Sequence, residues 1–267
     1  MTEVFGVIGH PIKHSLSPVM HNAAFRHLNY DGIYLAFEVR SGELESALNG
    51  ARALGIRGLN ITIPHKERAA EILTPDRAVE EIGACNTADL SEWRCYNTDV
   101  HGVLMALREA GIDINGIRVL VVGAGGAGKA CIYALRDAGE VFVTNRTAER
   151  GREVARRFGV EFIEMEGLAT QSFDLIVNAT PIGMKGFPDT LPVPEEVVRR
   201  CSAVFDMVYN PPETRLVKVG RKYGCRIASG VDMLIYQGAK AFEIFTGLKA
   251  PVDVMKRAVV SELEKLA

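Results

Sequence analysis

Short apolar runs alternate along the chain with longer segments whose apolar residues recur three or four positions apart. The first pattern is typical of strands and the second of amphipathic helices. The first hundred residues predict strands at Val4–Ile8, Ile33–Val39 and Gly58–Ile63, helices from Ser17, over Glu43–Leu54 and over Lys66–Leu73, and a hairpin of Cys85–Asp89 with Trp93–Tyr96.

The second part of the chain continues this alternation. The pattern predicts helices over Val100–Glu109, Lys129–Ala138 and Glu149–Arg157, and strands at Val119–Val122, Glu140–Thr144, Leu175–Asn178 and Ala203–Phe205. Two more helices follow Val231, and the last has an apolar face of Met255, Ala258, Val259, Leu263 and Leu266. Strands that alternate with helices indicate parallel β-α-β units, so the fold class is α/β.

A glycine-rich turn joins the strand at 119–122 to the helix that follows it, with the residues Gly123, Ala124, Gly125, Gly126, Ala127 and Gly128. A G-x-G-x-x-G turn between a strand and a helix is typical of dinucleotide-binding sites. Gly123 allows the tight turn, Gly125 lets a pyrophosphate approach the backbone, and Gly128 lets the helix pack closely on the strand. The helix N-terminus then offers N–H groups to the phosphates.

The end of the next strand indicates which dinucleotide is bound. An NAD site usually has an acidic residue there to hold the ribose 2′-hydroxyl, whereas this strand ends in Asn145-Arg146-Thr147. Arg146 suits bidentate phosphate contact, and Arg150 lies one helical turn further on. We therefore expect NADP. In the alternative interpretation, Thr147 caps the following helix and both arginines face solvent.

Composition narrows the classes of function. The 267 residues carry a net charge of -2, which argues against nucleic acid or an anionic membrane as the main partner. No apolar run is long enough to span a bilayer and no signal peptide is evident, so we expect a cytoplasmic protein. The five cysteines lack metal or redox spacing and should be reduced and mostly buried. We expect no metal, since Pro11 separates His10 from His14 on any helical face.

Polar residues gather around one predicted strand of the first hundred residues. Asn60 and Thr62 should point to one face of that strand, and Lys66 follows Pro64, which should end it. This arrangement suits a polar ligand pocket, and the alternative is an edge strand with a solvent-exposed lysine. Asp99 either caps the helix that follows it or faces Lys66.

Two serines mark the start of the first helix. Ser17 is the expected N-cap, with Pro18 at the first helical position. A helix start with two hydroxyls, from Ser15 and Ser17, also suits a carboxylate ligand. The sequence leaves both interpretations open.

Together these residues resemble the shikimate dehydrogenase family. The similar motifs of the first part are His14-Ser15-Leu16-Ser17-Pro18, Asn60-x-Thr62-x-Pro64-x-Lys66, Gly83-Ala84-x-Asn86-Thr87 and Asn97-Thr98-Asp99. Those of the second part are the glycine turn, Asn145-Arg146-Thr147, Asn178–Met184, Val208–Pro211, Gly230, Met233 and Tyr236–Ala239. The resemblance covers nearly the whole chain, in the family's order. The chain departs from it at three places. Cys95 replaces a usual glycine and the turn Ser91-Glu92 lacks glycine, so the hairpin backbone can differ there, and Phe245 stands where tryptophan is common, which we interpret as packing only.

The resemblance implies a fold of two α/β domains with a cleft between them. Residues 1–99 and 234–267 would form the substrate-binding and catalytic domain, and residues 100–233 a Rossmann-like NADP-binding domain, with the C-terminal helices packed back on the first domain. The implied oxidoreductase reaction is the reversible reduction of 3-dehydroshikimate to shikimate by NADPH, in the shikimate pathway of chorismate and aromatic amino-acid biosynthesis. The expected partners are this small-molecule substrate and NADP, without nucleic acid or membrane, and the chain would be a monomer or homodimer.

The resemblance also assigns roles to individual residues. Lys66 and Asp99 would form the catalytic pair, with Lys66 stabilising charge on the carbonyl oxygen and delivering its proton. The implied substrate residues are Ser15, Ser17, Asn60, Thr62, Asn86, Tyr209 and Gln237. The implied cofactor residues are the six of the glycine turn, Asn145, Arg146, Thr147, Arg150, Thr180, Met207 and Gly230. The resemblance also implies that Met207, Tyr209 and Gly230 lie near the nicotinamide.

Three other interpretations stay open. The first is a quinate or dual quinate/shikimate dehydrogenase, with NAD accepted. The second is a cofactor-binding regulator without turnover, which the intact Lys66 and Asp99 disfavour. The third is another two-domain oxidoreductase that shares the nucleotide fold, which the paired serines and the Asn60, Thr62 and Lys66 set disfavour.

Overall fold

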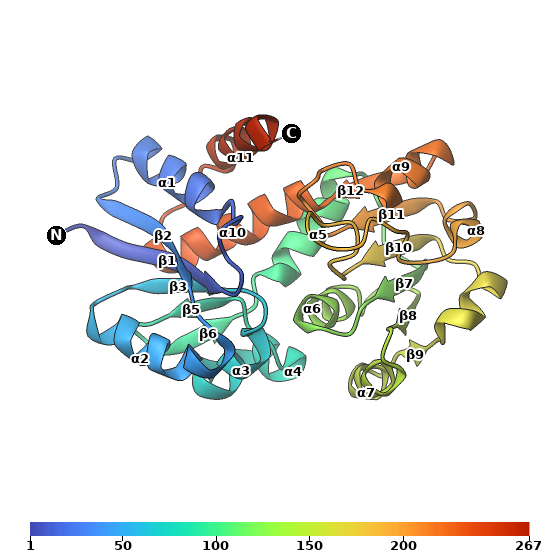
Figure 1. The fold of residues 1–267 in the computed structure, drawn as a ribbon, viewed down its shortest axis with the longest axis horizontal. Helices are drawn as coiled ribbons and strands as arrows, with labels where there is room; N and C mark the ends of the chain where they lie inside the picture. The colour runs from blue at the N-terminus through green and yellow to red at the C-terminus, as the bar shows by residue number, and fades with distance from the viewer. Residues whose placement is uncertain (267) are drawn as a thin grey trace. The chain divides into compact units, whose positions relative to one another are not determined.

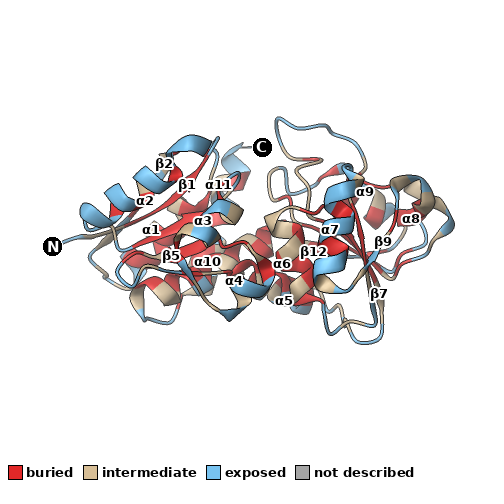
Figure 2. Cartoon of the chain, turned by 90° about the horizontal axis from the view of Figure 1, so that it is seen from below, coloured by how far each residue is buried: buried red, intermediate tan, exposed pale blue. Residues whose placement is uncertain are grey.

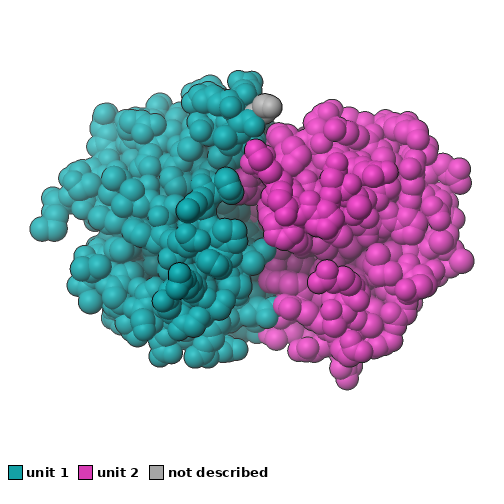
Figure 3. All heavy atoms as spheres, in the orientation of Figure 1, with its two compact units in different colours: residues 1–99, 235–266 teal, residues 100–234, 267 magenta. Residues whose placement is uncertain are grey.

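The computed structural model describes residues 1–266, which divide into two compact units (Figures 1 and 3). Unit 1 comprises residues 1–99 and 235–266, and unit 2 comprises residues 100–234. Each unit contains its own six-stranded sheet. The chain passes from unit 1 to unit 2 at the start of helix α5 (Asp99–Glu109) and returns within helix α10 (Gly230–Thr246).

The sheet of unit 1 is mixed. Its strand order is β2-β1-β3-β5-β6-β4, where β1, β2 and β3 run parallel and β5 is antiparallel to both β3 and β6. The strands are β1 (Glu3–Gly9), β2 (Gly32–Glu38), β3 (Gly58–Ile61), β4 (Thr74–Pro75), β5 (Thr87–Asp89) and β6 (Arg94–Tyr96). The predicted hairpin therefore forms, as the β5–β6 pair.

Helices bury both faces of this sheet. The helices of unit 1 are α1 (Ser17–His27), η1 (Ser41–Glu43), α2 (Leu44–Ala53), α3 (Lys66–Ile72), α4 (Arg77–Ile82), most of α10, and α11 (Val252–Leu266). Apolar residues of β1 and β3 form one core with α2 and α3. Phe5 of β1 packs instead against Phe25 of α1 and Phe245 of α10, which form a second, aromatic core. Helix α11 packs against α1, and Met255 and Val259 of its predicted apolar face are fully buried.

The sheet of unit 2 is parallel throughout, in the order β12-β11-β10-β7-β8-β9. Its strands are β7 (Arg118–Val122), β8 (Glu140–Thr144), β9 (Glu161–Phe162), β10 (Leu175–Asn178), β11 (Ala203–Asp206) and β12 (Arg226–Ser229). The strand order reverses between β7 and β10, as it does in the doubly wound dinucleotide-binding fold. Ligands of such sheets bind at the carboxyl ends of the strands beside this reversal.

The strands of unit 2 are apolar on both faces because helices cover both. Val119 and Val121 belong to one core cluster, and their neighbours Leu120 and Val122 belong to another. Figure 2 shows this burial along the strands. The helices are α5, α6 (Gly126–Ala134), α7 (Ala148–Phe158), η2 (Met165–Thr170), α8 (Glu195–Val198) and α9 (Arg215–Lys222). All five cysteines of the chain are free and buried.

Two predicted features of unit 1 are wrong. Ser17 is not the N-cap of α1, because that position belongs to Leu16, and the Oγ of Ser15 accepts a hydrogen bond from the N–H of Ser17 at 3.3 Å. Strand β3 ends at Ile61 rather than Ile63, so the strand alternation does not extend to Thr62.

Unit 2 and the hairpin differ from prediction at turns. Helix α6 spans Gly126–Ala134, whereas the predicted helix spans Lys129–Ala138. The helix starts earlier than predicted because a helix N-terminus needs no side-chain periodicity. The hairpin turn needs no glycine because the carboxylate of Asp89 accepts hydrogen bonds from the N–H groups of Ser91 and Glu92, and Trp93 adopts a positive φ of 56°. The sequence pattern missed the short elements β4, β9, β12, α4, α8 and α9 altogether.

A buried histidine lies behind the aromatic core of unit 1. His21 of α1 is fully buried and stacks on Tyr34 of β2, with ring centroids 4.2 Å apart and an interplanar angle of 5°. Neither of its ring nitrogens has a hydrogen-bond partner within residues 1–266. Burial lowers the pKa of His21 from 6.5 to about 3, so this histidine is neutral in the folded protein above pH 4.

The burial of His21 predicts that the free energy of unfolding decreases as the pH falls. The pKa of His21 is depressed by folding, so its contribution to stability is present above pH 6.5 and is lost as the pH falls toward 3. Between pH 7 and pH 5 we expect His21 to account for a loss of about 2 kcal/mol in the free energy of unfolding. Urea titrations of the wild type and of His21→Leu at both pH values measure this, because the variant should lose less. His27→Gln, at an exposed position of the same helix, is the control. Equal pH dependence in the wild type and His21→Leu would exclude this role.

Candidate active site

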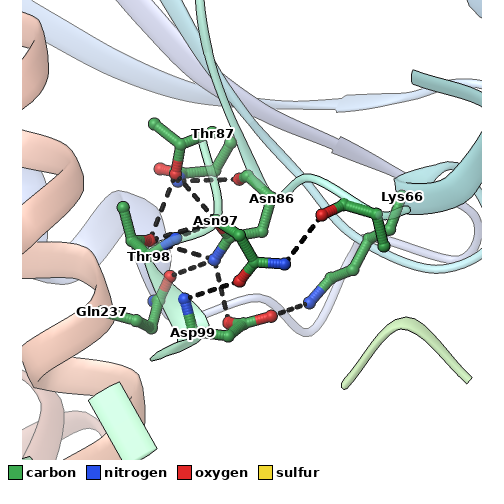
Figure 4. Close-up of polar contacts among 9 residues, drawn as sticks. Lys66, Asn86, Thr87, Asn97, Thr98, Asp99 and Gln237 are labelled. Atoms are coloured by element: carbon green, nitrogen blue, oxygen red, sulfur yellow. Dashed lines mark hydrogen bonds and ion pairs between the residues drawn. The ribbon is translucent and has the colours of Figure 1, made fainter. Parts of the chain in front are cut away.

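The predicted pair of Lys66 and Asp99 meets in unit 1 (Figure 4). The Nζ of Lys66 donates to the Oδ2 of Asp99 at 2.5 Å. The two side chains are only 14% and 6% exposed, although 33 positions separate them in the chain. Of the two interpretations of Asp99, facing Lys66 is therefore correct, and Asp99 is also the first residue of α5. The ion pair lies at the edge of a polar cluster.

Backbone contacts on both sides of Lys66 fix where its side chain starts. Lys66 is the first residue of α3, and its carbonyl accepts a hydrogen bond from the N–H of Cys85 at 2.9 Å. The ring of the preceding residue, His65, is buried, and its Nε2 contacts the carbonyl of Val39 at 2.7 Å. These contacts fix the backbone from which the lysine side chain extends to Asp99.

Asn86 connects Asp99 to the rest of the polar cluster. Its Nδ2 donates to the Oδ1 of Asp99 at 2.8 Å and approaches the Oε1 of Gln237 of α10 at 3.3 Å. Its Oδ1 accepts from the N–H of Thr98 at 2.7 Å. Asn97, which precedes this threonine, accepts from the N–H of Asp99 at 3.1 Å. Three segments far apart in the sequence therefore place one carboxylate.

Ser17, the first residue of α1, is connected to the same cluster through Tyr34. The hydroxyl of Tyr34 donates to the Oδ1 of Asn60 at 2.7 Å and forms a side-chain hydrogen bond with Ser17. Burial raises the pKa of Tyr34 well above 10, so it remains a neutral donor. The Nδ2 of Asn60 donates to the carbonyl of Asn86 and to the Oγ1 of Thr87 at 3.1 and 3.0 Å. Both the oxygen and the nitrogen of the Asn60 side chain therefore form hydrogen bonds within the protein, and Asn60 supports the cluster.

The remaining substrate residues lie less deeply. Ser15 and Thr62 are half-buried, and Thr62 accepts the N–H of His65 on its carbonyl at 2.9 Å. Tyr209 belongs to unit 2, where it follows β11 and is half-buried. Tyr209 is thus the one residue of the expected substrate set that belongs to unit 2.

The glycine turn of unit 2 has the close packing that its motif requires. Gly123 has a φ of +113°, and a Cβ there would lie 3.0 Å from the carbonyl oxygen of Ala179. A Cβ at Gly128 would lie 2.0 Å from the carbonyl oxygen of Gly123. At Gly125 a Cβ would meet no atom within 4 Å, so the space beside this residue is open to a ligand. The residues therefore fit a pyrophosphate at the N-terminus of α6.

The residues after β8 brace this turn and extend beyond it. The Oδ1 of Asn145 accepts from the N–H of Ala124 at 3.1 Å, and its Nδ2 donates to the carbonyl of Thr147. The Nε of Arg150 donates to the carbonyl of Ala124 at 3.1 Å, which leaves its terminal nitrogens beside the turn. Arg146 is exposed. Thr147 is at the N-cap position of α7, as the alternative interpretation expected, although its side chain makes no capping hydrogen bond.

Other predicted cofactor residues follow the remaining strand ends of unit 2. Thr180 comes after β10, and Met207 comes after β11. Gly230 is the first residue of α10, directly after β12, and a Cβ there would lie 2.4 Å from the carbonyl oxygen of Val208. The predicted cofactor residues thus occupy the carboxyl ends of β7, β8, β10, β11 and β12, which is one edge of one sheet.

Sequence reasoning missed several residues that hold the site. Tyr34 was not selected, because an aromatic residue in a strand is typical of ordinary packing. Thr87 and Thr98 lie within the family motifs but were given no role of their own. Asp206, at the end of β11, was also missed. The signal available for Asp206 is an acidic residue directly after an apolar strand.

Within residues 1–266, no group of three potential metal-ligand side chains is present, and no helix is both long and apolar enough to cross a membrane.

Comparison with known proteins identifies the family. Family models match residues 7–88 (shikimate dehydrogenase substrate binding domain), 105–183 (shikimate/quinate 5-dehydrogenase) and 230–260 (shikimate 5′-dehydrogenase C-terminal domain). A shikimate dehydrogenase (NADP⁺) of Archaeoglobus fulgidus is 49% identical over 271 residues, covering 97% of this chain and 98% of the relative. The chain belongs to the shikimate dehydrogenase family.

Solved structures of the family have the same fold. A shikimate dehydrogenase in complex with NADP⁺ superposes with a TM-score of 0.91 at 38% identity, covering 98% of this chain and 96% of that one. The shikimate 5-dehydrogenase of Thermus thermophilus, in complex with NADP(H) and shikimate, gives a TM-score of 0.89 at 38% identity over 97% and 99% of the two chains. The expected α/β fold with a Rossmann-like unit is confirmed.

The packing of the glycine turn predicts two separable effects. Gly128→Ala places a methyl group against the backbone of Gly123 and should lower the free energy of unfolding by about 1–3 kcal/mol. Gly125→Ala meets no atom and keeps an allowed φ of -84°, so stability should change by less than about 0.5 kcal/mol while NADPH binding weakens. Thermal unfolding and NADPH titration of both variants measure this. A stability loss as large in Gly125→Ala as in Gly128→Ala would show that the packing argument is wrong.

Proposed function

We propose that this chain is an NADP-dependent shikimate dehydrogenase, which catalyses the reversible reduction of 3-dehydroshikimate to shikimate in aromatic amino-acid biosynthesis. The observation that carries the proposal is the Lys66–Asp99 pair, held by Asn86 and Gln237 in a unit matched by the family's substrate-binding model. We assign substrate binding to unit 1 and NADP binding to unit 2. The free, buried thiols and the balanced charge favour a cytoplasmic enzyme, as a monomer or homodimer.

The polar cluster of unit 1 suits a small polyhydroxylated acid. The hydroxyls of Ser15 and Ser17 at the start of α1 are assigned to the substrate carboxylate. Thr62, Asn86 and Gln237 are assigned to ring hydroxyls, because amides and hydroxyls both donate and accept hydrogen bonds. In this assignment Asn60 supports Asn86 rather than contacting the substrate.

Lys66 performs the proton chemistry of the proposed reaction. NADPH, when bound at the glycine turn of unit 2, supplies the hydride that reduces the carbonyl carbon. Lys66 stabilises the negative charge that develops on the carbonyl oxygen and then delivers a proton to it. Asp99 orients the Nζ of Lys66 through the 2.5 Å contact. In the reverse direction Lys66 accepts the hydroxyl proton.

The direct test is an absorbance assay of NADPH formation by the purified protein. Shikimate and quinate are offered in parallel, each with NADP and with NAD, and we expect shikimate with NADP to give the highest kcat/KM. Lys66→Ala should lower kcat by about 10²–10⁴-fold, the usual scale for a positioned acid or base. Lys249→Ala, at an exposed position of unit 1, is the control. Absence of turnover with both substrates would refute the proposal, and near-wild-type kcat in a folded Lys66→Ala enzyme would refute the role of Lys66.

The choice of NADP over NAD is tested at the exposed arginine. Arg146→Asp replaces a phosphate-binding cation by the acid that NAD sites use for the ribose hydroxyl. We expect the Kd for NADPH to rise at least tenfold more than the Kd for NADH, which corresponds to about 1.4 kcal/mol. Arg157→Asp, at the exposed far end of the same helix α7, controls for the change in net charge. Equal weakening of both cofactors would contradict the assignment of the 2′-phosphate.

A further inference from the structure

A buried carboxylate lies at the edge of the unit 2 sheet that carries the predicted cofactor residues. It is not itself one of the predicted site residues. Asp206 is the last residue of β11 and is 1% exposed. Its oxygens accept hydrogen bonds from Asn178, Val208 and Thr214, which are all neutral donors. Burial raises the pKa of the Asp206 carboxyl, and these hydrogen bonds oppose that rise. A carboxylate buried among neutral groups is costly, so its retention at this edge calls for a specific purpose.

The first oxygen of Asp206 joins two turns. Its Oδ1 accepts from the Nδ2 of Asn178 at 3.0 Å and from the N–H of Val208 at 3.1 Å. Asn178 ends β10, and its Oδ1 accepts from both the N–H and the hydroxyl of Thr180, at 3.1 and 2.6 Å. The N–H of Met207 donates to the carbonyl of Asn178 at 3.1 Å. The turns that carry Thr180 and Met207 are therefore bound to one another through this asparagine and carboxylate.

The second oxygen joins the turn after β11 to a helix. The Oδ2 of Asp206 accepts from the Oγ1 of Thr214 at 2.5 Å. Thr214 is the N-cap of α9, and its Oγ1 accepts from the N–H of Val217 at 3.2 Å. A threonine hydroxyl has one hydrogen to donate and can accept from another group, so Thr214 serves the helix and the carboxylate together.

We propose that Asp206 is a positioning residue for the nicotinamide end of the cofactor site, because its carboxylate fixes the segment that presents Met207 and Tyr209. The inference rests on the proposed function and names how this chain holds that part of NADP. The segment after β11 has no helix or strand of its own. Its place is set by Asp206 on one side and by the close approach of Gly230 to Val208 on the other. Asp206 acts through these residues and touches no reacting atom.

The test compares variants of Asp206 and Thr214 that alter the hydrogen bond between these two residues. Asp206→Asn keeps the shape of the side chain but puts an amide where one carboxylate oxygen accepted the Thr214 hydroxyl. Thr214→Val removes that hydroxyl, whereas the separate variant Thr214→Ser keeps a hydroxyl at this position. We expect the Kd for NADPH, measured by nucleotide fluorescence, to rise about tenfold in Asp206→Asn and in Thr214→Val, and to stay within about twofold of wild type in Thr214→Ser.

A control variant on the same strand distinguishes positioning of the cofactor site from a general effect on stability. Val204→Ala removes buried apolar volume from β11 and leaves every hydrogen bond of Asp206 in place. It should lower the melting temperature as much as Asp206→Asn without changing the Kd for NADPH. The inference is overturned if Val204→Ala weakens NADPH equally, or if Asp206→Asn and Thr214→Val bind NADPH as the wild type does. Should Asp206→Asn fail to fold, the two Thr214 variants still decide. A wild type that binds NADPH but oxidises no shikimate refutes the proposed reaction and leaves this inference intact.

Discussion

The buried ion pair of Lys66 and Asp99 is the interaction on which the organisation of unit 1 depends. Two nearly buried charges lose most of their hydration, and their mutual attraction offsets this only when the remaining hydrogen-bonding capacity is also satisfied. Asn86 satisfies the second carboxylate oxygen. Such a pair adds little stability over apolar side chains of similar size, whereas losing one partner typically costs about 3–5 kcal/mol. Its presence is better explained by chemistry that needs a cation in a site of restricted solvent access.

The same constraint accounts for the length of the polar network. Each group that places Asp99 is itself polar and buried, so it needs further partners in turn. Asn86 is supported by Thr98 and by Asn60, and Asn60 is supported by Tyr34. The network ends where it meets apolar packing, at the stack of Tyr34 on His21. Fully satisfied networks of this kind favour a single arrangement of the site over alternatives.

The strands and helices with a clear apolar periodicity were predicted well from the sequence. Elements whose bounds depend on turns were predicted less well. All four predicted strands of unit 2 form, because helices on both faces make them continuous apolar runs. The edge strand β12 was missed, since its sequence, Arg226–Ser229, has no such run. In the site, the catalytic pair was predicted through motifs, since a contact across 33 positions has no periodic signal. The supporting residues Tyr34 and Asp206 were not, because their roles depend on which strands become neighbours.

The two units solve the problem of holding polar ligands in different ways. Unit 1 uses side chains, because a substrate that differs from its analogues by single hydroxyls is recognised by placed donors and acceptors. Unit 2 uses backbone at the glycine turn, where Gly125 leaves open space and the helix N-terminus suits phosphates of any nucleotide. Side chains are needed in unit 2 where discrimination is needed, and we assign Arg146 to the 2′-phosphate. The buried carboxylate of Asp206 accepts the N–H of Val208, in a turn that has no helix or strand of its own. Under the proposed function, changes in substrate preference should therefore arise in unit 1, and changes in the choice between NADP and NAD at the end of β8.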